Sequence, residues 1–367
     1  MPTDSPKVRD FTSRERKPSV AVRTSPVYEL LLSLFVLGGR ASADQYECGL
    51  GFFEQLPATA DEELRTQLAS FAGCQQLWLS FIGLFGDRKA PTNIDAFVDH
   101  LNAMDPLALW RLFIDSECDD AETASPADLQ AAAAGDEEAL ARLLASDEIT
   151  PARKKLIGDP PEVTLLRIIA VLRGVNEILG SSIDEIMPAL RRDAAEKRAM
   201  ATSLDAPSLV ESATNGVTFD ASRAFRGVVL IPSNIIRPWT VLSENDGFGI
   251  FAYSVADEHL NADPDTPPTY LVDLFKALGD ERRLRMLAML SEGDHNLTEI
   301  ADRVGLAKST THHHLRTLRS AGLVRVIVGE DKRYSLRRDR LPDTGNLLKA
   351  YLSRPVETPV AVPAERS

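Results

Sequence analysis

The stretch from Leu297 to Leu336, LTEIADRVGLAKSTTHHHLRTLRSAGLVRVIVGEDKRYSL, constrains this chain more than any other part of it. Apolar residues at helical spacing are followed by a glycine, by a second helical pattern and by two alternating segments. This order predicts a helix, a tight turn, a second helix and a β-hairpin. A helix-turn-helix with such a hairpin, or wing, is suited to placing its second helix in the major groove of DNA.

Local signals predict where the two helices begin and end. Asn296 followed by Glu299 is typical of a capping box at the start of the first helix. Gly305 supplies the turn, and Gly322 can adopt the left-handed conformation that closes the second helix. Ala307 stands at the start of the second helix, which therefore lacks a side-chain cap that is usually worth about 1 kcal/mol.

The second helix has two chemically different faces. One face carries Thr311, His314, Leu315 and Leu318, which we expect to be buried. The first turn and the other faces carry hydroxyls, imidazoles and cations, which suit base edges and phosphates, and the wing adds two cations at or beside its tip. The predicted DNA contacts are Thr298, Lys308, Ser309, Thr310, His312, His313, Arg316, Lys332 and Arg333.

Three consecutive histidines, His312, His313 and His314, invite a metal-site interpretation. Consecutive residues of a helix point about 100° apart, so these imidazoles fan around the helix and cannot converge on one ion. We therefore expect no metal here. His314 is predicted to pack in the core, whereas His312 and His313 could contact DNA.

Further amphipathic segments flank this stretch. Leu271, Leu274, Phe275 and Leu278 form a stripe at helical spacing after Pro268, and residues 343–351 form a last amphipathic helix. The intervening helix, ERRLRMLAMLSEG, is predicted to bury Leu284, Met286, Leu287 and Leu290.

Together, residues 268–351 resemble the ArsR family of winged-helix transcriptional regulators. The likeness rests on ALGDERRLRMLAMLSEG, LTEIADRVGLAKSTTHHHLRTLRSAGLVRV and KRYSL. It implies a homodimer that pairs residues 268–278 and 343–351 and binds a palindromic operator of double-stranded DNA. A repressor is the role that we expect.

The family's metal sensors carry a CxC pair on the helix equivalent to Leu297–Val304, or Asp and His ligands on the last helix. This chain has no cysteine in the first segment and no histidine in residues 343–351. Metal sensing at either position is therefore not expected, and no cofactor is predicted.

Charge is distributed unevenly along the chain. The net charge is −13, yet residues 268–352 contain fifteen Lys and Arg against eleven Asp and Glu, and residues 308–340 contain nine against three. The C-terminal region is therefore basic within an acidic protein. The acidic remainder should repel phosphate and limit non-specific binding to DNA.

The residues before this region predict a second, larger domain. Residues 1–20 read as a disordered arm, 21–256 as a mainly helical sensor or oligomerisation domain, 257–267 as a linker, 268–352 as the winged helix and 353–367 as a disordered tail. A β section at about 215–256 should hold three or four antiparallel strands, with a hairpin turn at Asn245-Asp246-Gly247. The expected fold is mainly α with small β elements.

Other functional classes find little support in the sequence. The large domain has no GxSxG, HExxH, P-loop or GxGxxG motif, so we expect no enzyme. The longest apolar run, residues 28–39, is too short to span a membrane, and no signal peptide is evident. A cytoplasmic regulator with an unknown small-molecule effector is the main expectation. The alternative is a DNA-targeted fusion whose N-terminal domain is an enzyme or a protein-interaction module.

Overall fold

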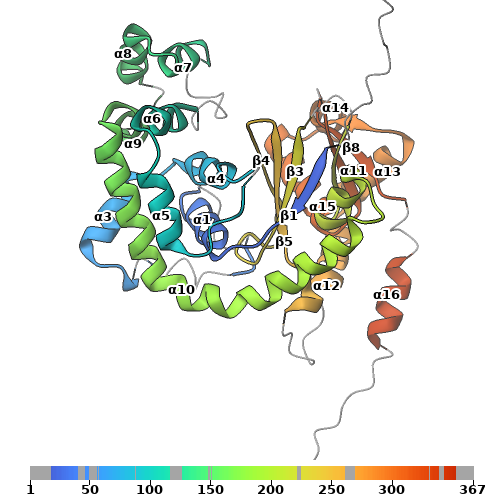
Figure 1. Ribbon diagram of the computed structural model, residues 1–367. Helices are drawn as coiled ribbons and strands as arrows, with labels where there is room; N and C mark the ends of the chain where they lie inside the picture. The colour runs from blue at the N-terminus through green and yellow to red at the C-terminus, as the bar shows by residue number, and fades with distance from the viewer. Residues whose placement is uncertain are drawn as a thin grey trace, which may run out of the picture.

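The computed structural model describes residues 18–39, 46–48, 56, 58–86, 88–115, 126–147, 149, 151–220, 225–260, 269–329, 331–338 and 343–352. A helical lobe, a mixed sheet and the C-terminal winged helix follow one another across the molecule (Figure 1). Helices predominate, and the described strands form two four-stranded sheets. The expected mainly α fold with small β elements is confirmed.

The helical lobe surrounds α1 (Pro26–Leu37), which is buried along almost its whole length. Ser25 caps this helix by accepting a hydrogen bond from the Val27 N–H, and Pro26 occupies the first turn. The other helices of the lobe are α3 (Glu62–Ser70), α4 (Gln75–Gly83), α5 (Ile94–Asn102), α6 (Pro106–Asp115), α7 (Pro126–Ala133), α8 (Glu137–Ala145) and α9 (Pro151–Gly158).

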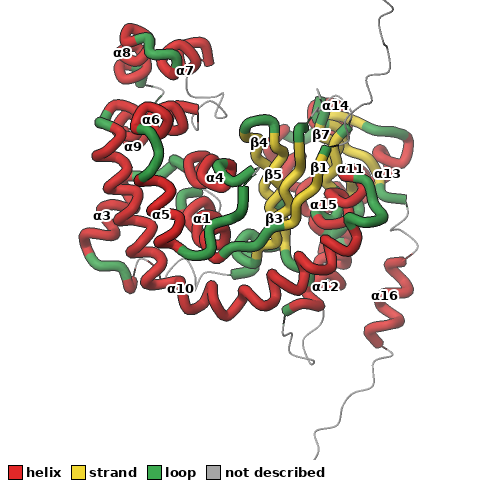
Figure 2. Tube along the Cα trace, viewed as in Figure 1, coloured by secondary structure: helices red, strands yellow, loops and turns green. Residues whose placement is uncertain are grey.

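A single helix of 40 residues, α10 (Pro161–Met200), runs from the lobe toward the winged helix (Figure 2). The sequence pattern suggests two helices here, separated near Gly180. A glycine inside a helix costs only about 1 kcal/mol, and contacts with the lobe and the sheet along α10 outweigh that cost. None of the described helices, α10 included, is long and apolar enough to cross a membrane.

The first sheet is mixed, which corrects the expectation of antiparallel strands. Its order is β1-β3-β5-β4, with β1 parallel to β3 and β3 parallel to β5. Only β4 and β5 form an antiparallel hairpin, and its turn has positive φ at Asp246 and Gly247, as predicted. The strands are β1 (Ser19–Val22), β3 (Gly227–Ser233), β4 (Val241–Asn245) and β5 (Phe248–Ser254).

Strand β1 also corrects the predicted limit of the disordered arm, because Ser19 and Val20 pair with β3. The remaining arm, residues 1–17, lies outside the described residues, as do most of the predicted linker (261–267) and the tail (353–367). The first linker residues form a short 3-10 helix, η2 (Asp257–His259). The predicted domain limits are otherwise not tested.

The winged helix contains the helices and the hairpin that the sequence predicts, together with one two-residue strand, His295–Asn296, that it does not. They are α12 (Thr269–Leu278), α13 (Glu281–Glu292), β6 (His295–Asn296), α14 (Leu297–Val304), α15 (Lys308–Ser320), β7 (Val324–Val328), β8 (Arg333–Leu336) and α16 (Asp343–Leu352). One side chain differs from expectation, since Leu284, which the sequence predicts to be buried, is 48% exposed; Phe275, on the apolar stripe of α12, is 43% exposed. Helical periodicity marks an apolar side of each helix but cannot tell whether this chain alone covers it.

A short strand from the large domain joins the sheet of the wing. After α11 (Ala206–Ala213), strand β2 (Val217–Phe219) pairs in parallel with β7, with Val217 opposite Val326. The second sheet therefore has the order β2-β7-β8-β6. Pairing of this kind satisfies the backbone groups that an isolated wing would leave free along β7.

Two hydrophobic cores follow from this arrangement. One fills the helical lobe and reaches one side of the first sheet. The other joins residues of that sheet, such as Phe251, to α11, β2 and the winged helix, including Leu209, Leu315 and Val324. The winged helix thus shares its core with the large domain.

Polar contacts reinforce this shared core. Glu211 on α11 pairs with Arg325 at 2.7 Å and with Arg337 at 3.5 Å. Arg337 also donates to the Asn215 side chain, which in turn donates to the Ser320 carbonyl. These contacts fix the C-terminal end of α15 and the base of the wing against α11 and β2.

Replacing Glu211 with Gln should lower the free energy of unfolding by about 1–3 kcal/mol, because it removes the negative charge that pairs with Arg325 and with the buried Arg337 guanidinium. Urea unfolding measures this loss. Glu281→Gln is the matched control, since Glu281 pairs with Arg285 in an exposed position and should change stability by less than about 0.5 kcal/mol. Equal effects of the two variants would contradict the role given to Glu211.

Candidate nucleic-acid interface

The helix-turn-helix is built by the predicted local signals. Asn296 accepts from the Glu299 N–H at 2.9 Å, and the Glu299 carboxylate accepts from the Asn296 N–H at 3.0 Å, which completes the capping box. Gly305 has φ 68° at the turn, and Gly322 has φ 71° after α15. These features set the angle at which α15 leaves α14.

One face of α15 is buried as predicted. Leu315 and Leu318 have no exposed surface, Thr311 is fully buried, and His314 is 8% exposed. Burial lowers the pKa of the His314 imidazole, with Asp280 acting in the opposite direction. His314 is therefore a core residue, and its neighbours on the opposite side of the helix face outward.

The predicted DNA contacts divide into two groups by exposure. Thr310, His312 and Arg316 are half-buried, and the others are exposed, namely Thr298, Lys308, Ser309, His313, Lys332 and Arg333. The exposed group includes the first turn of α15, which has free backbone N–H groups as well as a cation and a hydroxyl. That end of the helix suits a phosphate or a base edge.

Arg333 has a structural role beside its predicted one. It pairs with Asn296 across β8 and β6, and its guanidinium donates to the Asp294 carbonyl at 2.6 Å. The side chain therefore holds the turn before α14 against the wing. Its contact with DNA stays a prediction, as do the other contacts in the set.

A cluster of basic side chains lies on one flank of α15. It consists of His312, Arg316 and Arg319 on the helix and Lys332 on the wing. Burial, followed by the charge of Lys332, lowers the pKa of His312 to about 4, so this imidazole is neutral at pH 7. Burial, with Arg316 beside it, lowers the pKa of Arg319 to about 10.

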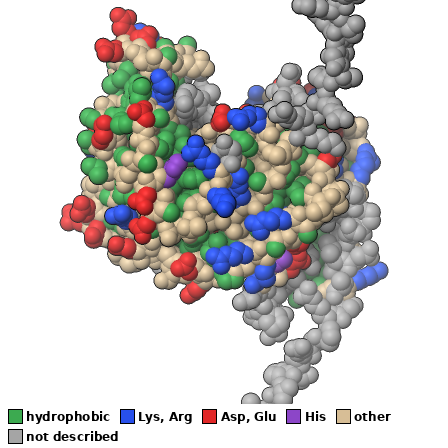
Figure 3. Space-filling view, in the orientation of Figure 1, with side chains coloured by type: hydrophobic (Ala, Val, Ile, Leu, Met, Phe, Trp, Pro, Cys, Tyr) green, Lys and Arg blue, Asp and Glu red, His purple; other side chains and the backbone are tan. Residues whose placement is uncertain are grey.

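Arg319 is a member that the sequence analysis missed, although its spacing from His312 and Arg316 places it on the same flank. No carboxylate of the described residues forms an ion pair with Arg316, Arg319 or Lys332. These charges therefore lack a carboxylate counter-ion among the described residues. Figure 3, in the orientation of Figure 1, shows basic side chains toward the middle of the face that it draws and many of the acidic ones over the helical lobe.

The large domain contacts this flank through an aromatic ring. The Arg316 guanidinium lies over the Trp239 ring, 3.9 Å from its centroid. Tyr46 is also near: burial raises the pKa of its hydroxyl, and the charge of Arg316 opposes that shift. No pattern in the sequence indicates this contact, because Trp239 and Arg316 lie on different domains.

The loop that carries Trp239 is fixed by buried polar groups. Arg237 donates to Glu47 at 2.7 Å and also to Asp257 and the Val255 carbonyl. Near the start of the loop, the Glu29 carboxylate accepts from the backbone N–H groups of Asn234 and Ile235. Trp239 is thereby held in one position, 8% exposed.

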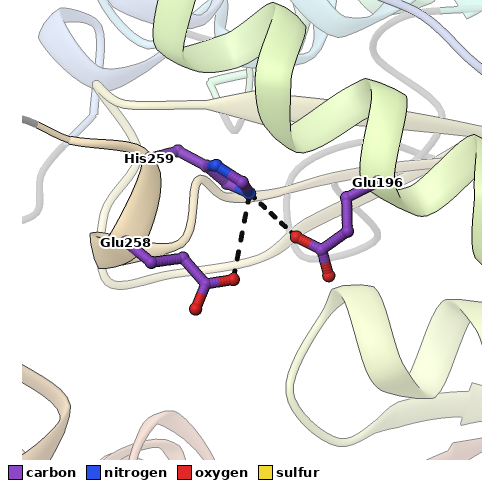
Figure 4. A group of neighbouring side chains, drawn as sticks. All are labelled: Glu196, Glu258 and His259. Carbon is purple, nitrogen blue, oxygen red and sulfur yellow. Dashed lines mark hydrogen bonds and ion pairs between the residues drawn. The ribbon is translucent and has the colours of Figure 1, made fainter.

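Glu196, Glu258 and His259 are the described side chains whose types and spacing could hold a metal ion (Figure 4). The His259 Nε2 lies 2.8 Å from Glu196 and 3.9 Å from Glu258. Lys197 already pairs with Glu196 at 3.0 Å and is the largest cause of the lowered pKa of that carboxyl. Within the described structure this group is an ion-pair network that fastens η2 to α10.

The missing cap of α15 gives a stability test. Ala307 has extended backbone angles, φ −61° and ψ 147°, and makes no side-chain cap. Ala307→Ser should raise the free energy of unfolding by about 1 kcal/mol, because its hydroxyl can accept from an unpaired N–H of the first turn. Ala288→Ser, in the exposed middle of α13, is the control and should give no gain. Urea unfolding compares them, and an unchanged Ala307→Ser protein would contradict the expectation.

Comparison with known proteins agrees with this geometry. Residues 280–326 match the family model for bacterial regulatory proteins of the arsR family. A segment of 53 residues is 42% identical to the transcriptional activator HlyU of Vibrio cholerae serotype O1, covering 14% of this chain and 49% of that relative. The chain thus spans about half the length of the curated relative it matches, and no solved structure matches it. Residues 280–326, from α13 into β7, form a helix-turn-helix of the ArsR type.

Proposed function

We propose that the protein is a DNA-binding transcriptional regulator of the ArsR type. In this proposal α15 enters the major groove and the wing contacts the neighbouring backbone. The single observation that carries it is the ArsR-type helix-turn-helix with an exposed, cationic and hydroxyl-bearing first turn at Lys308 and Ser309. The basic charge of residues 308–340 supplies the attraction to phosphate.

The proposed regulator represses transcription by occupying a palindromic operator. The relative named above is a transcriptional activator, so the sign of regulation must be measured for this chain. The sign is measured with a reporter gene placed under an operator that the protein selects from random DNA. If the protein is a repressor, deleting its gene raises reporter expression. Lower expression after deletion would make the protein an activator.

A homodimer is part of the proposal, because a two-fold operator requires two recognition helices. Apolar side chains remain exposed on the helices that the family resemblance places at the interface: Phe275 on α12 is 43% exposed and Leu352 on α16 is 70% exposed. These two helices also contact each other within the chain. A second copy would cover this apolar surface.

We propose that the large domain serves as a sensor for a small-molecule effector and has no catalytic role. Support comes from its sequence, which has none of the hydrolase, metalloprotease or nucleotide-binding motifs named above. Its direct packing on the winged helix would transmit a change in the domain to the DNA-binding surface. The proposed location is the cytoplasm, where the DNA of a bacterial regulator lies.

Lys308→Ala and Lys332→Ala should each weaken binding to a duplex selected from random sequence by the full-length protein. The expected loss is roughly tenfold, and the slope of log affinity against log salt should fall by about 1 for each lost phosphate contact. Fluorescence anisotropy at several salt concentrations measures both quantities.

Arg111→Gln is the matched control, because Arg111 is an exposed cation on α6 in the helical lobe. Its affinity should stay within about twofold of the unmodified protein. If Lys308→Ala and Lys332→Ala behave like this control, the assigned surface is wrong. If the full-length protein selects no duplex, the proposed function itself is wrong.

Phe275→Glu should shift the protein from dimer to monomer, because it places a carboxylate in an apolar interface. Sedimentation equilibrium measures the mass. Leu166→Glu is the control, since Leu166 is 68% exposed on α10 and should leave the mass unchanged. A monomeric unmodified protein at micromolar concentration, or an unaffected Phe275→Glu variant, would contradict the proposed dimer.

A further inference from the structure

The outward flank of the recognition helix is covered by the large domain in this structure. Arg316 lies two turns after Lys308 on α15, away from the buried Leu315 and Leu318. A side chain in that position of a helix-turn-helix faces the groove. Here its guanidinium lies instead 3.9 Å from the centre of the Trp239 ring.

Burial around this contact extends beyond Arg316. Arg319 is 8% exposed, and burial lowers the pKa of His312, Arg316 and Arg319 alike. The first turn of α15, with Lys308 and Ser309, remains exposed. DNA could therefore reach the start of α15, but the flank of Arg316 is occupied by protein.

We propose that the Trp239–Arg316 contact holds the winged helix in a form that is closed to DNA, and that specific binding requires this contact to open. The proposal rests on the proposed DNA-binding function and adds a regulatory step to it. The large domain thereby acts as an inhibitor of its own recognition helix.

Buried polar contacts within the large domain hold the Trp239 loop in place. Trp239 follows Arg237, whose guanidinium is anchored by Glu47 and Asp257. Glu29, buried in the core, holds the beginning of the same loop through two backbone N–H groups. A ring held this firmly binds a cation without losing conformational freedom, which strengthens the stacking.

The same contact can open because it is the weaker of two attachments. At a separate attachment, β2 pairs with β7, and Glu211 binds Arg325 and Arg337. At Trp239 the attachment is a cation over a ring, next to further cations that lack a carboxylate partner among the described residues. DNA phosphates would supply the negative charge that Arg316, Arg319 and Lys332 lack in the closed form.

When closed and open forms are in equilibrium, the apparent affinity for DNA equals the affinity of the open form multiplied by the fraction of protein that is open. Trp239→Leu keeps an apolar side chain but removes the ring face, whereas Trp239→Phe keeps a ring. We expect Trp239→Leu to bind the selected duplex about five- to thirty-fold more tightly than the unmodified protein, the range expected for losing a desolvated cation–π contact. Trp239→Phe should stay within about threefold.

The direction of the change in DNA affinity of Trp239→Leu shows whether the Trp239–Arg316 contact restricts DNA binding. Weaker binding by Trp239→Leu would mean that Trp239 positions Arg316 for DNA, and equal binding would mean that the contact does not restrict access. Either result overturns the closed form while leaving DNA binding intact. If neither the unmodified protein nor Trp239→Leu binds DNA, the proposed function itself is contradicted. Thermal unfolding followed by circular dichroism verifies that each variant is folded.

A second measurement follows the exposure of the Trp239 ring in the unmodified chain and uses Trp239→Phe as its reference. The fluorescence of Trp239 is obtained as the difference between the unmodified protein and Trp239→Phe. Addition of the duplex should shift this difference spectrum to longer wavelength and increase its quenching by iodide, because the ring loses its cover. An unchanged difference spectrum in the saturated complex would overturn the proposal.

Discussion

Strand β2 is three residues long, yet the position of the whole winged helix depends on its pairing with β7. The pairing joins the large domain to the wing by backbone hydrogen bonds, and the apolar side chains of β2 and α11 extend the core of the winged helix into that domain. Glu211 adds charge at the same place, since it neutralises Arg325 and the buried Arg337. Because β2 fixes one edge of the winged helix, α15 is brought within reach of Trp239.

The cations of the winged helix are therefore placed in two different surroundings. Arg325 on β7 and Arg337 after β8 pair with Glu211 and join the domains. Those on the flank of α15, Arg316 and Arg319, meet a ring and one another, and no described carboxylate pairs with them. In the free protein the Trp239 ring covers Arg316. Under the proposal, DNA phosphates replace this ring as the partner of the flank cations.

Much of the C-terminal region could be predicted because its determinants are local. The capping box at Asn296, the glycine turn at Gly305 and the buried side of α15 each depend on residues a few positions apart. The exposed Phe275 and Leu284 were not predictable in the same way, since periodicity shows an apolar face and not what covers it. The continuity of α10 past Gly180 was missed because packing along the helix outweighed a weak local signal.

The sequence by itself determined that residues 268–352 carry a helix-turn-helix with a wing, that its recognition helix has a basic flank and a buried side, and that the large domain is mainly helical. Tertiary structure alone decided that β1 and β3 run parallel, that β2 joins the wing and that Trp239 stacks on Arg316. The physical reason is distance along the chain. Strand partners and an aromatic ring over a cation are chosen by shape and charge between segments far apart, and no spacing within one segment records that choice.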